Sequence, residues 1–193
     1  MTEYRVKVYN DRTEWFNLNS LLHREDGPAI EWNKGAKSWW INGKRHRIDG
    51  PAKEWENGDK EWFLNGLLHR EDGPAIDWND GTKEWFINGQ RHREDGPAII
   101  LPNGYKSWIL NDQYHRVDGP AIEYASGTKE WRLNGRLHRE NGPAIEYASG
   151  TKEWFINGEE LTEQEFNEMI KKINSCNGKV VEIDGKKFKL VEI

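Results

Sequence analysis

Histidines are the residues of this chain best suited to chemistry, and all of them stand in one recurring motif. The motif reads His-Arg-x-Asp-Gly-Pro-Ala, with Asn in place of Asp in its last copy, and it returns every 23 residues. An imidazole can ligate a metal ion or transfer a proton near neutral pH. The six histidines are His23, His46, His69, His92, His115 and His138.

The even spacing argues against a shared metal ion. If each repeat supplies two strands to a sheet, equivalent atoms of neighbouring repeats lie about 10 Å apart. Zinc needs nitrogen ligands at about 2 Å, and therefore ligands close to one another. We predict no metal site and no cofactor. The histidines are expected to form a structural ladder, each hydrogen-bonded beneath a turn.

The arginine and the aspartate of the motif stand two residues apart, as in Arg47 and Asp49. On a strand this spacing puts both side chains on one face, where they can pair across repeats as a charge ladder. A row of arginines that binds phosphates is the functional alternative, and the neighbouring carboxylates oppose it.

Turn signals divide each repeat into strands, as in the unit that begins at Trp62. Asn65-Gly66 predicts a type I′ turn, because both residues tolerate positive φ. Asn79-Asp80-Gly81 predicts a longer turn with glycine in the left-handed region. Gly-Pro cannot lie within a central strand, so it predicts a bend in each return strand. The expected fold is mainly β, an elongated single-layer antiparallel meander of six to seven hairpin repeats.

Three regions follow from this pattern. Residues 1–13 are expected to form an N-terminal capping strand, and residues 14–158 the repeat array. Residues 159–193 are expected to form a C-terminal cap of a helix and a hairpin. Thr162 to Glu165 is a capping box that opens the helix. The hairpin would pair residues 180–183 with 188–191 and turn at Asp184-Gly185.

Composition limits the possible partners. The chain is only 35% hydrophobic and 32% charged, but it holds 11 tryptophans, which predicts a thin fold held by aromatic side chains. A net charge of -5 disfavours extended nucleic acid as a partner. No apolar run is long enough to insert in a membrane, and Met-Thr-Glu-Tyr-Arg-Val lacks a signal-peptide core. With the single cysteine, Cys176, this favours a cytoplasmic protein.

Two sets of aromatic residues stand out. One tryptophan per repeat is expected to form the stacked core of the sheet, and a track of exposed aromatics is the alternative. The fifth repeat departs most from its siblings, which suggests a binding patch there. The core series is Trp39, Trp62, Trp85, Trp108, Trp131 and Trp154, and the patch residues are Tyr105, Trp108, Tyr114, Arg116 and Arg132.

The pattern Trp-x-x-Asn-Gly-x-x-His, repeated every 23 residues over about residues 14–158, resembles membrane occupation and recognition nexus (MORN) repeats. MORN units usually continue His-Gly-x-Gly, whereas this chain has His-Arg-x-Asp-Gly-Pro-Ala. The variant is similar to repeats of uncharacterised phage and large-virus proteins. The resemblance implies an elongated antiparallel sheet without catalysis of its own, which contacts partners or serves as a scaffold.

These observations predict a non-enzymatic binding module. The resemblance points to a phage or viral accessory protein that binds a host macromolecule, such as a defence protein, in the host cytoplasm. Two alternatives remain open. One is sequestration of a small nucleotide between aromatic and arginine side chains at repeat junctions, and the other is a structural or assembly scaffold.

Overall fold

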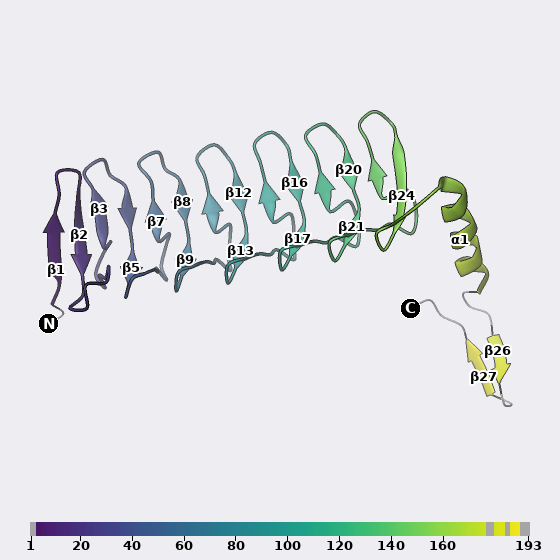
Figure 1. Ribbon diagram of the computed structural model, residues 1–193, viewed down its shortest axis with the longest axis horizontal. Helices are drawn as coiled ribbons and strands as arrows, with labels where there is room; N and C mark the ends of the chain where they lie inside the picture. The colour runs from purple at the N-terminus through teal and green to yellow at the C-terminus, as the bar shows by residue number, and fades with distance from the viewer. Residues whose placement is uncertain (1–2, 177–179, 184–185, 190–193) are drawn as a thin grey trace.

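The computed structural model describes residues 3–176, 180–183 and 186–189. Hairpins stand side by side along one axis, and a single helix follows the last of them (Figure 1). As predicted, the fold is mainly β, with a 15-stranded antiparallel sheet whose strands follow one another in chain order.

The main sheet contains β1 (Arg5–Val8), β2 (Arg12–Phe16), β3 (Ile30–Trp32), β4 (Lys37–Ser38), β7 (Lys53–Glu54), β8 (Lys60–Glu61), β11 (Ile76–Asp77), β12 (Lys83–Glu84), β15 (Ile99–Ile100), β16 (Lys106–Ser107), β19 (Ile122–Glu123), β20 (Lys129–Glu130), β23 (Ile145–Glu146), β24 (Lys152–Ile156) and β25 (Glu159–Leu161).

Five repeats also form a second, smaller hairpin, at the Asn-Gly turn or at Asn111-Asp112, which the sequence pattern had merged with the first. Asn65 and Gly66 have φ values of 53° and 87°, as a type I′ turn requires. The small hairpins pair β5 (Trp40–Ile41) with β6 (Lys44–Arg45), β9 (Phe63–Leu64) with β10 (Leu67–Leu68), β13 (Phe86–Ile87) with β14 (Gln90–Arg91), β17 (Ile109–Leu110) with β18 (Gln113–Tyr114), and β21 (Arg132–Leu133) with β22 (Arg136–Leu137).

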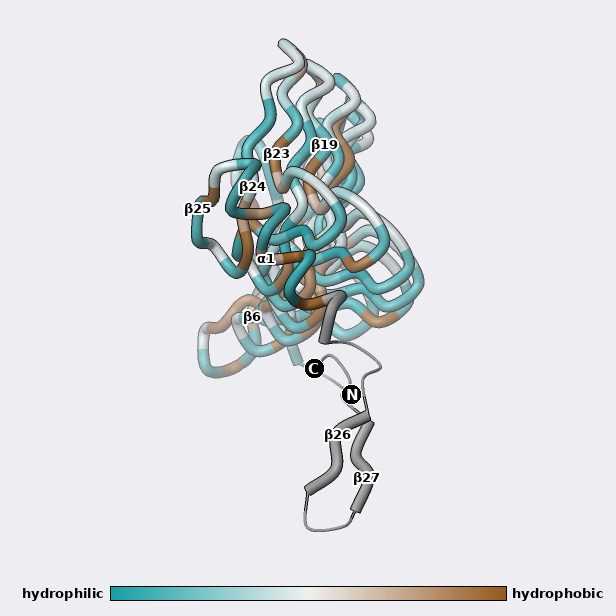
Figure 2. The backbone as a smooth tube through the Cα atoms, turned by 90° about the vertical axis from the view of Figure 1, so that its right-hand side faces the viewer, coloured by the Kyte–Doolittle hydropathy of each residue, from teal (hydrophilic) through white to brown (hydrophobic). Residues whose placement is uncertain are grey.

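The His-Arg-x-Asp-Gly-Pro segment, here called the motif loop, connects the small hairpin to the next strand of the main sheet. It lies outside the strands, so Gly-Pro does bend the chain at a constant place. When the array is viewed along its length, successive repeats overlay one another, with the long hairpins forming an arm above a broader base (Figure 2).

The alanine that ends each motif is completely buried. Its carbonyl accepts a 2.8 Å hydrogen bond from the backbone N–H of the tryptophan just before the small hairpin, as in Trp62 and Ala75. Complete burial of the methyl group means that a larger side chain would displace neighbouring atoms. Six alanines are 0% exposed: Ala29, Ala52, Ala75, Ala98, Ala121 and Ala144.

The expectation that the tryptophan series forms the core is therefore only partly right. Trp62 packs against a buried cluster of Ala75, Ile76 and Phe86, but it remains half-buried. The thin fold buries small and aliphatic side chains completely, while the large indole rings lie at its margin.

The two ends of the array are closed differently. Strand β1 pairs with β2 at the N-terminal edge. At the other end, helix α1 (Glu163–Cys176) packs against β24 and β25 and buries Phe166. The predicted capping box is present, because the Thr162 N–H donates to Glu165 Oε2 at 2.8 Å and the Glu165 N–H donates to Thr162 Oγ1 at 3.2 Å.

A last hairpin is also present, but its second strand begins at Lys186, two residues earlier than predicted. Its strands are β26 (Val180–Ile183) and β27 (Lys186–Lys189), which pair antiparallel. The turn residues Asp184-Gly185 and the end of the second strand predicted at Val191 lie outside the described residues.

Candidate functional site

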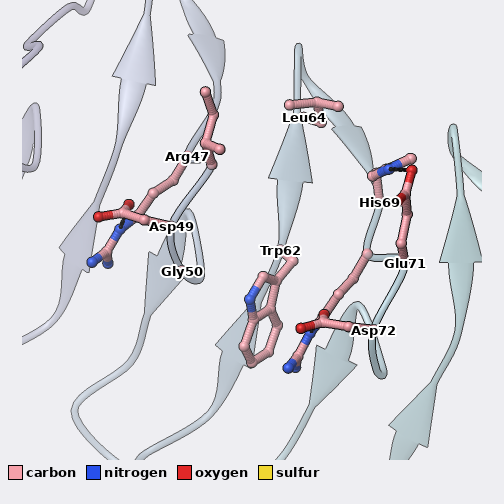
Figure 3. Close-up of a pocket in the computed structure, with 10 residues that line it drawn as sticks. Arg47, Asp49, Gly50, Trp62, Leu64, His69, Glu71 and Asp72 are labelled. Atoms are coloured by element: carbon pink, nitrogen blue, oxygen red, sulfur yellow. Dashed lines mark hydrogen bonds and ion pairs between the residues drawn. The ribbon is translucent and has the colours of Figure 1, made fainter.

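A groove of similar lining lies at each of five consecutive repeat junctions. One wall is the motif loop of the preceding repeat, and the other comes from the tryptophan, small hairpin and motif loop of the next. In the groove of Figure 3, Arg47 and Asp49 face Trp62, Leu64 and His69. The five volumes run from about 410 to about 690 Å³.

The arginine of each motif loop lies over the tryptophan of its own repeat. The Arg70 guanidinium carbon is 4.1 Å from the centre of the Trp62 ring. The same guanidinium donates from Nε to Asp72 Oδ1 at 2.8 Å and from Nη1 to the Pro74 carbonyl at 3.3 Å. The ring, the carboxylate and the carbonyl together hold the arginine in a fixed position.

Equivalent stacks recur along the array, with guanidinium-to-ring distances between 3.8 and 4.3 Å. The arginine and the aspartate therefore pair within one motif loop. The expected pairing across repeats was wrong, because the two residues lie in a bend and not on a strand.

The glycine of the motif is required by this packing and not by its own dihedral angles. A Cβ atom at Gly73 would lie 2.8 Å from the Arg70 guanidinium carbon, closer than carbon atoms can approach. Glycine thus leaves the space in which the arginine lies flat against the loop.

The positive and the negative side chains of the grooves differ in their exposure to solvent. The arginine side chains are largely covered, whereas the carboxylates of the motif loop project outward: Asp72 is 82% and Glu71 is 86% exposed. The Arg70 hydrogen bond holds the pKa of Asp72 below its ordinary value. The hydrogen bond from the arginine of the same loop likewise lowers the pKa of Asp49, Asp95 and Asp118. The rims of the grooves are consequently negative at neutral pH.

The six histidines lie in a row and connect neighbouring repeats. In five of them, Nδ1 accepts a hydrogen bond of 3.1–3.3 Å from the backbone N–H of the asparagine that opens the next Asn-Gly turn, as Asn88 does to His69. In the sixth, His92 Nδ1 lies 2.9 Å from Asn111 Oδ1. Within the described part of the chain, no three His, Cys, Asp or Glu side chains are arranged to hold a metal ion.

The residues predicted as a patch divide into two groups. Trp108 and Arg116 form one of the stacks described above, 3.9 Å apart, and line a groove. Arg132 and Tyr114 belong to a different cluster, in which the guanidinium lies 5.8 Å from the tyrosine ring.

That second cluster continues to Tyr105 and Tyr124, whose rings meet edge to face at 5.7 Å. Glu130 connects it, because it accepts from Tyr124 Oη at 2.8 Å and from Arg132 Nε at 2.7 Å. Burial is the main cause that raises the pKa of Tyr124, and the hydrogen bond to Glu130 raises it further. The fifth repeat thus carries a hydrogen-bonded tyrosine cluster next to an ordinary groove.

Comparisons with protein-family models and with curated proteins find no match for this chain. Among the described residues, no helix has the length and apolar character needed to cross a lipid bilayer.

Proposed function

We propose that the protein is a non-enzymatic binding module of MORN-like type, whose row of grooves receives a protein partner extended along the array. The observation that carries the proposal is the recurrence of one groove with the same kinds of side chain at five successive junctions. A partner that enters several grooves gains affinity from each without needing a single deep pocket.

The polar groups of the groove favour binding over catalysis. In the groove of Figure 3 the arginines are held by Asp49, Asp72 and the proline carbonyls, and His69 Nδ1 is occupied by Asn88. Groups engaged in this way are positioned for contact, whereas an acid, base or nucleophile must exchange protons with a substrate.

The rim carboxylates favour a partner that carries basic residues near its aromatic or aliphatic contacts. A virus-encoded protein that occludes a host protein would suit such a surface, and that setting depends on the resemblance of the repeats.

A small anionic ligand, such as a nucleotide, is the second candidate, and one groove favours it. Arg47 and Arg139 each pair with a second carboxylate, Glu54 and Glu146, seven residues further on. For Arg70 and Arg93 the corresponding positions are Asp77 and Ile100, and Asp77 pairs with Lys83. In the groove between these two arginines, of about 690 Å³, neither guanidinium therefore has this second carboxylate, although Glu71, Asp72, Glu94 and Asp95 also line it.

Affinity capture with the full chain tests the main proposal. Leu64→Lys and Ile87→Lys each place a charge in a groove, and Leu67→Lys serves as the matched control, because Leu67 is exposed and its equivalent in the preceding repeat is Lys44. We expect a specific protein to be captured by the wild type and the control, with at least about tenfold weaker binding to the double groove variant.

Capture that is equal for the groove variant and the control would contradict the proposal, as would no capture at all. A stoichiometric rise in melting temperature with nucleotides, lost in Arg70→Ala or Arg93→Ala, would favour the second candidate instead.

A further inference from the structure

A row of large side chains borders the long turns of the main sheet, away from the grooves. Each member stands two residues after the first residue of the strand that follows a motif loop. We call it the turn row: Trp32, Trp55, Trp78, Leu101, Tyr124 and Tyr147. Trp55 and Trp78 are 45% and 38% exposed, and neither lines a groove.

The first gap in the turn row is filled by a cation of the protein itself. Lys53 stands where the other repeats have isoleucine, and its Nζ lies 3.8 Å from the Trp32 ring centre and 4.2 Å from the Trp55 ring centre. Lys53 is only 5% exposed, so the two rings replace much of the water around its ammonium group. Two neighbouring members of the row are therefore separated by the width that an ammonium group needs.

The second gap, between Trp55 and Trp78, is built alike but is not filled in this way. Ile76 stands at the position of Lys53, and its side chain is shorter and uncharged. In this second gap Asp59 is the residue between the positions of Trp55 and Trp78. In the first gap the equivalent residue, between Trp32 and Trp55, is Ala36.

Asp59 is fixed at this place by the neighbouring turn. Its Oδ1 accepts a 2.8 Å hydrogen bond from the backbone N–H of Asn79, next to Trp78. Because Lys60 pairs with Asp77, Asp59 lies opposite Trp78, which directly follows the adjacent strand. The strand register thus places Asp59 between the exposed residues Trp55 and Trp78.

We propose that the gap between Trp55 and Trp78 is a binding site for an alkylammonium group of a partner, as carried by lysine and methylated lysine side chains. Indole faces attract cations, most strongly those that shed water easily, and Asp59 supplies the opposite charge. The later gaps differ. The gap after Trp78 has Thr82 between its walls and Leu101 as its second wall, and the gap between Leu101 and Tyr124 is occupied by Tyr105, whose ring lies 5.7 Å from that of Tyr124.

Tetramethylammonium tests the site directly in the full chain, with tert-butanol as the uncharged probe of similar shape. The chain has 11 tryptophans, so indole N–H signals in an NMR titration report which rings are contacted. We expect saturable shifts at Trp55 and Trp78 with tetramethylammonium, and much smaller shifts with tert-butanol.

Three substitutions use the internal example of Lys53. Ile76→Lys should fill the gap with the protein's own ammonium group and weaken tetramethylammonium binding about tenfold or more. Ile145→Lys makes the same change in another repeat and should leave binding unaltered. Lys53→Ile should empty the first gap, so that the Trp32 signal also begins to shift.

Asp59→Asn keeps an oxygen for the Asn79 N–H, gives up the hydrogen bond from Asn57 Nδ2 and removes the charge, so it should weaken binding about threefold. If Ile76→Lys does not fold, this variant decides the question. The proposal is overturned by absent or unsaturable shifts, by equal shifts with both probes, or by full binding in folded Ile76→Lys or in Asp59→Asn. None of these outcomes depends on the grooves.

Discussion

Replacement of Gly73 by alanine tests whether the arginine stacks hold the motif loops in place. The new methyl group would lie 2.8 Å from the Arg70 guanidinium carbon. The guanidinium is the flexible end of its side chain, so we expect the arginine to move and not the backbone. The cost of Gly73→Ala is then limited to the contacts that Arg70 loses.

Those contacts can be given a magnitude. A partly covered cation over an indole contributes about 1 kcal/mol, and a hydrogen bond to a carbonyl such as that of Pro74 contributes about 1 kcal/mol. Replacing glycine where the backbone permits alanine stabilises by about 0.4–1 kcal/mol through the unfolded chain. We therefore expect Gly73→Ala to lower the free energy of unfolding by about 1–2 kcal/mol.

A double-mutant cycle in urea separates this mechanism from others. On the background Arg70→Ala, the clash is gone, so Gly73→Ala should be neutral or slightly stabilising. The coupling energy should be about 2 kcal/mol. Additive effects of the two substitutions would refute the reasoning, because the methyl group would then be clashing with something other than Arg70.

Two further predictions concern the histidine row and the motif carboxylates. His69→Ala removes the acceptor for the Asn88 N–H, so hydrogen exchange at the Asn88 amide should speed up several-fold while an equivalent amide such as Asn134 is unaffected; an unchanged Asn88 rate would contradict the role of the histidine. The motif aspartates have folded pKa values below their ordinary value of 3.8, so the stability from their ion pairs is present above that pH and is lost as the pH falls through the lower, folded values. Urea midpoints should therefore fall as the pH is lowered below 3.8, and less so when Asp49, Asp72, Asp95 and Asp118 are all changed to Asn. Identical pH profiles would show that these pairs do not contribute.

The sixth repeat naturally has asparagine, Asn141, at the position of the motif aspartate. Arg139 Nε donates to Asn141 Oδ1 at 3.1 Å, and its guanidinium still lies 3.8 Å from the Trp131 ring. An amide therefore keeps the geometry of the loop without the charge. This is why the aspartate-to-asparagine variants can report on charge alone.

The repeat period, the two turns and the bend at Gly-Pro could all be read from the sequence. Each depends on local backbone preferences: Asn65 and Gly66 tolerate positive φ, and proline cannot donate to a ladder of strands. The capping box of α1 is local for the same reason. Preferences of neighbouring residues are sufficient to place such elements.

Contacts between residues distant in the sequence required the folded chain. Whether Arg70 pairs across repeats or within its loop depends on how the bend is oriented, and no local preference sets that orientation. The order of strands across the sheet decides that Asp59 stands between Trp55 and Trp78, and which side chain occupies each gap of the turn row. Periodicity therefore specified the repeating unit, whereas the packing of one unit against the next created the grooves and the ammonium-sized gaps, because both are spaces between units and belong to none of them alone.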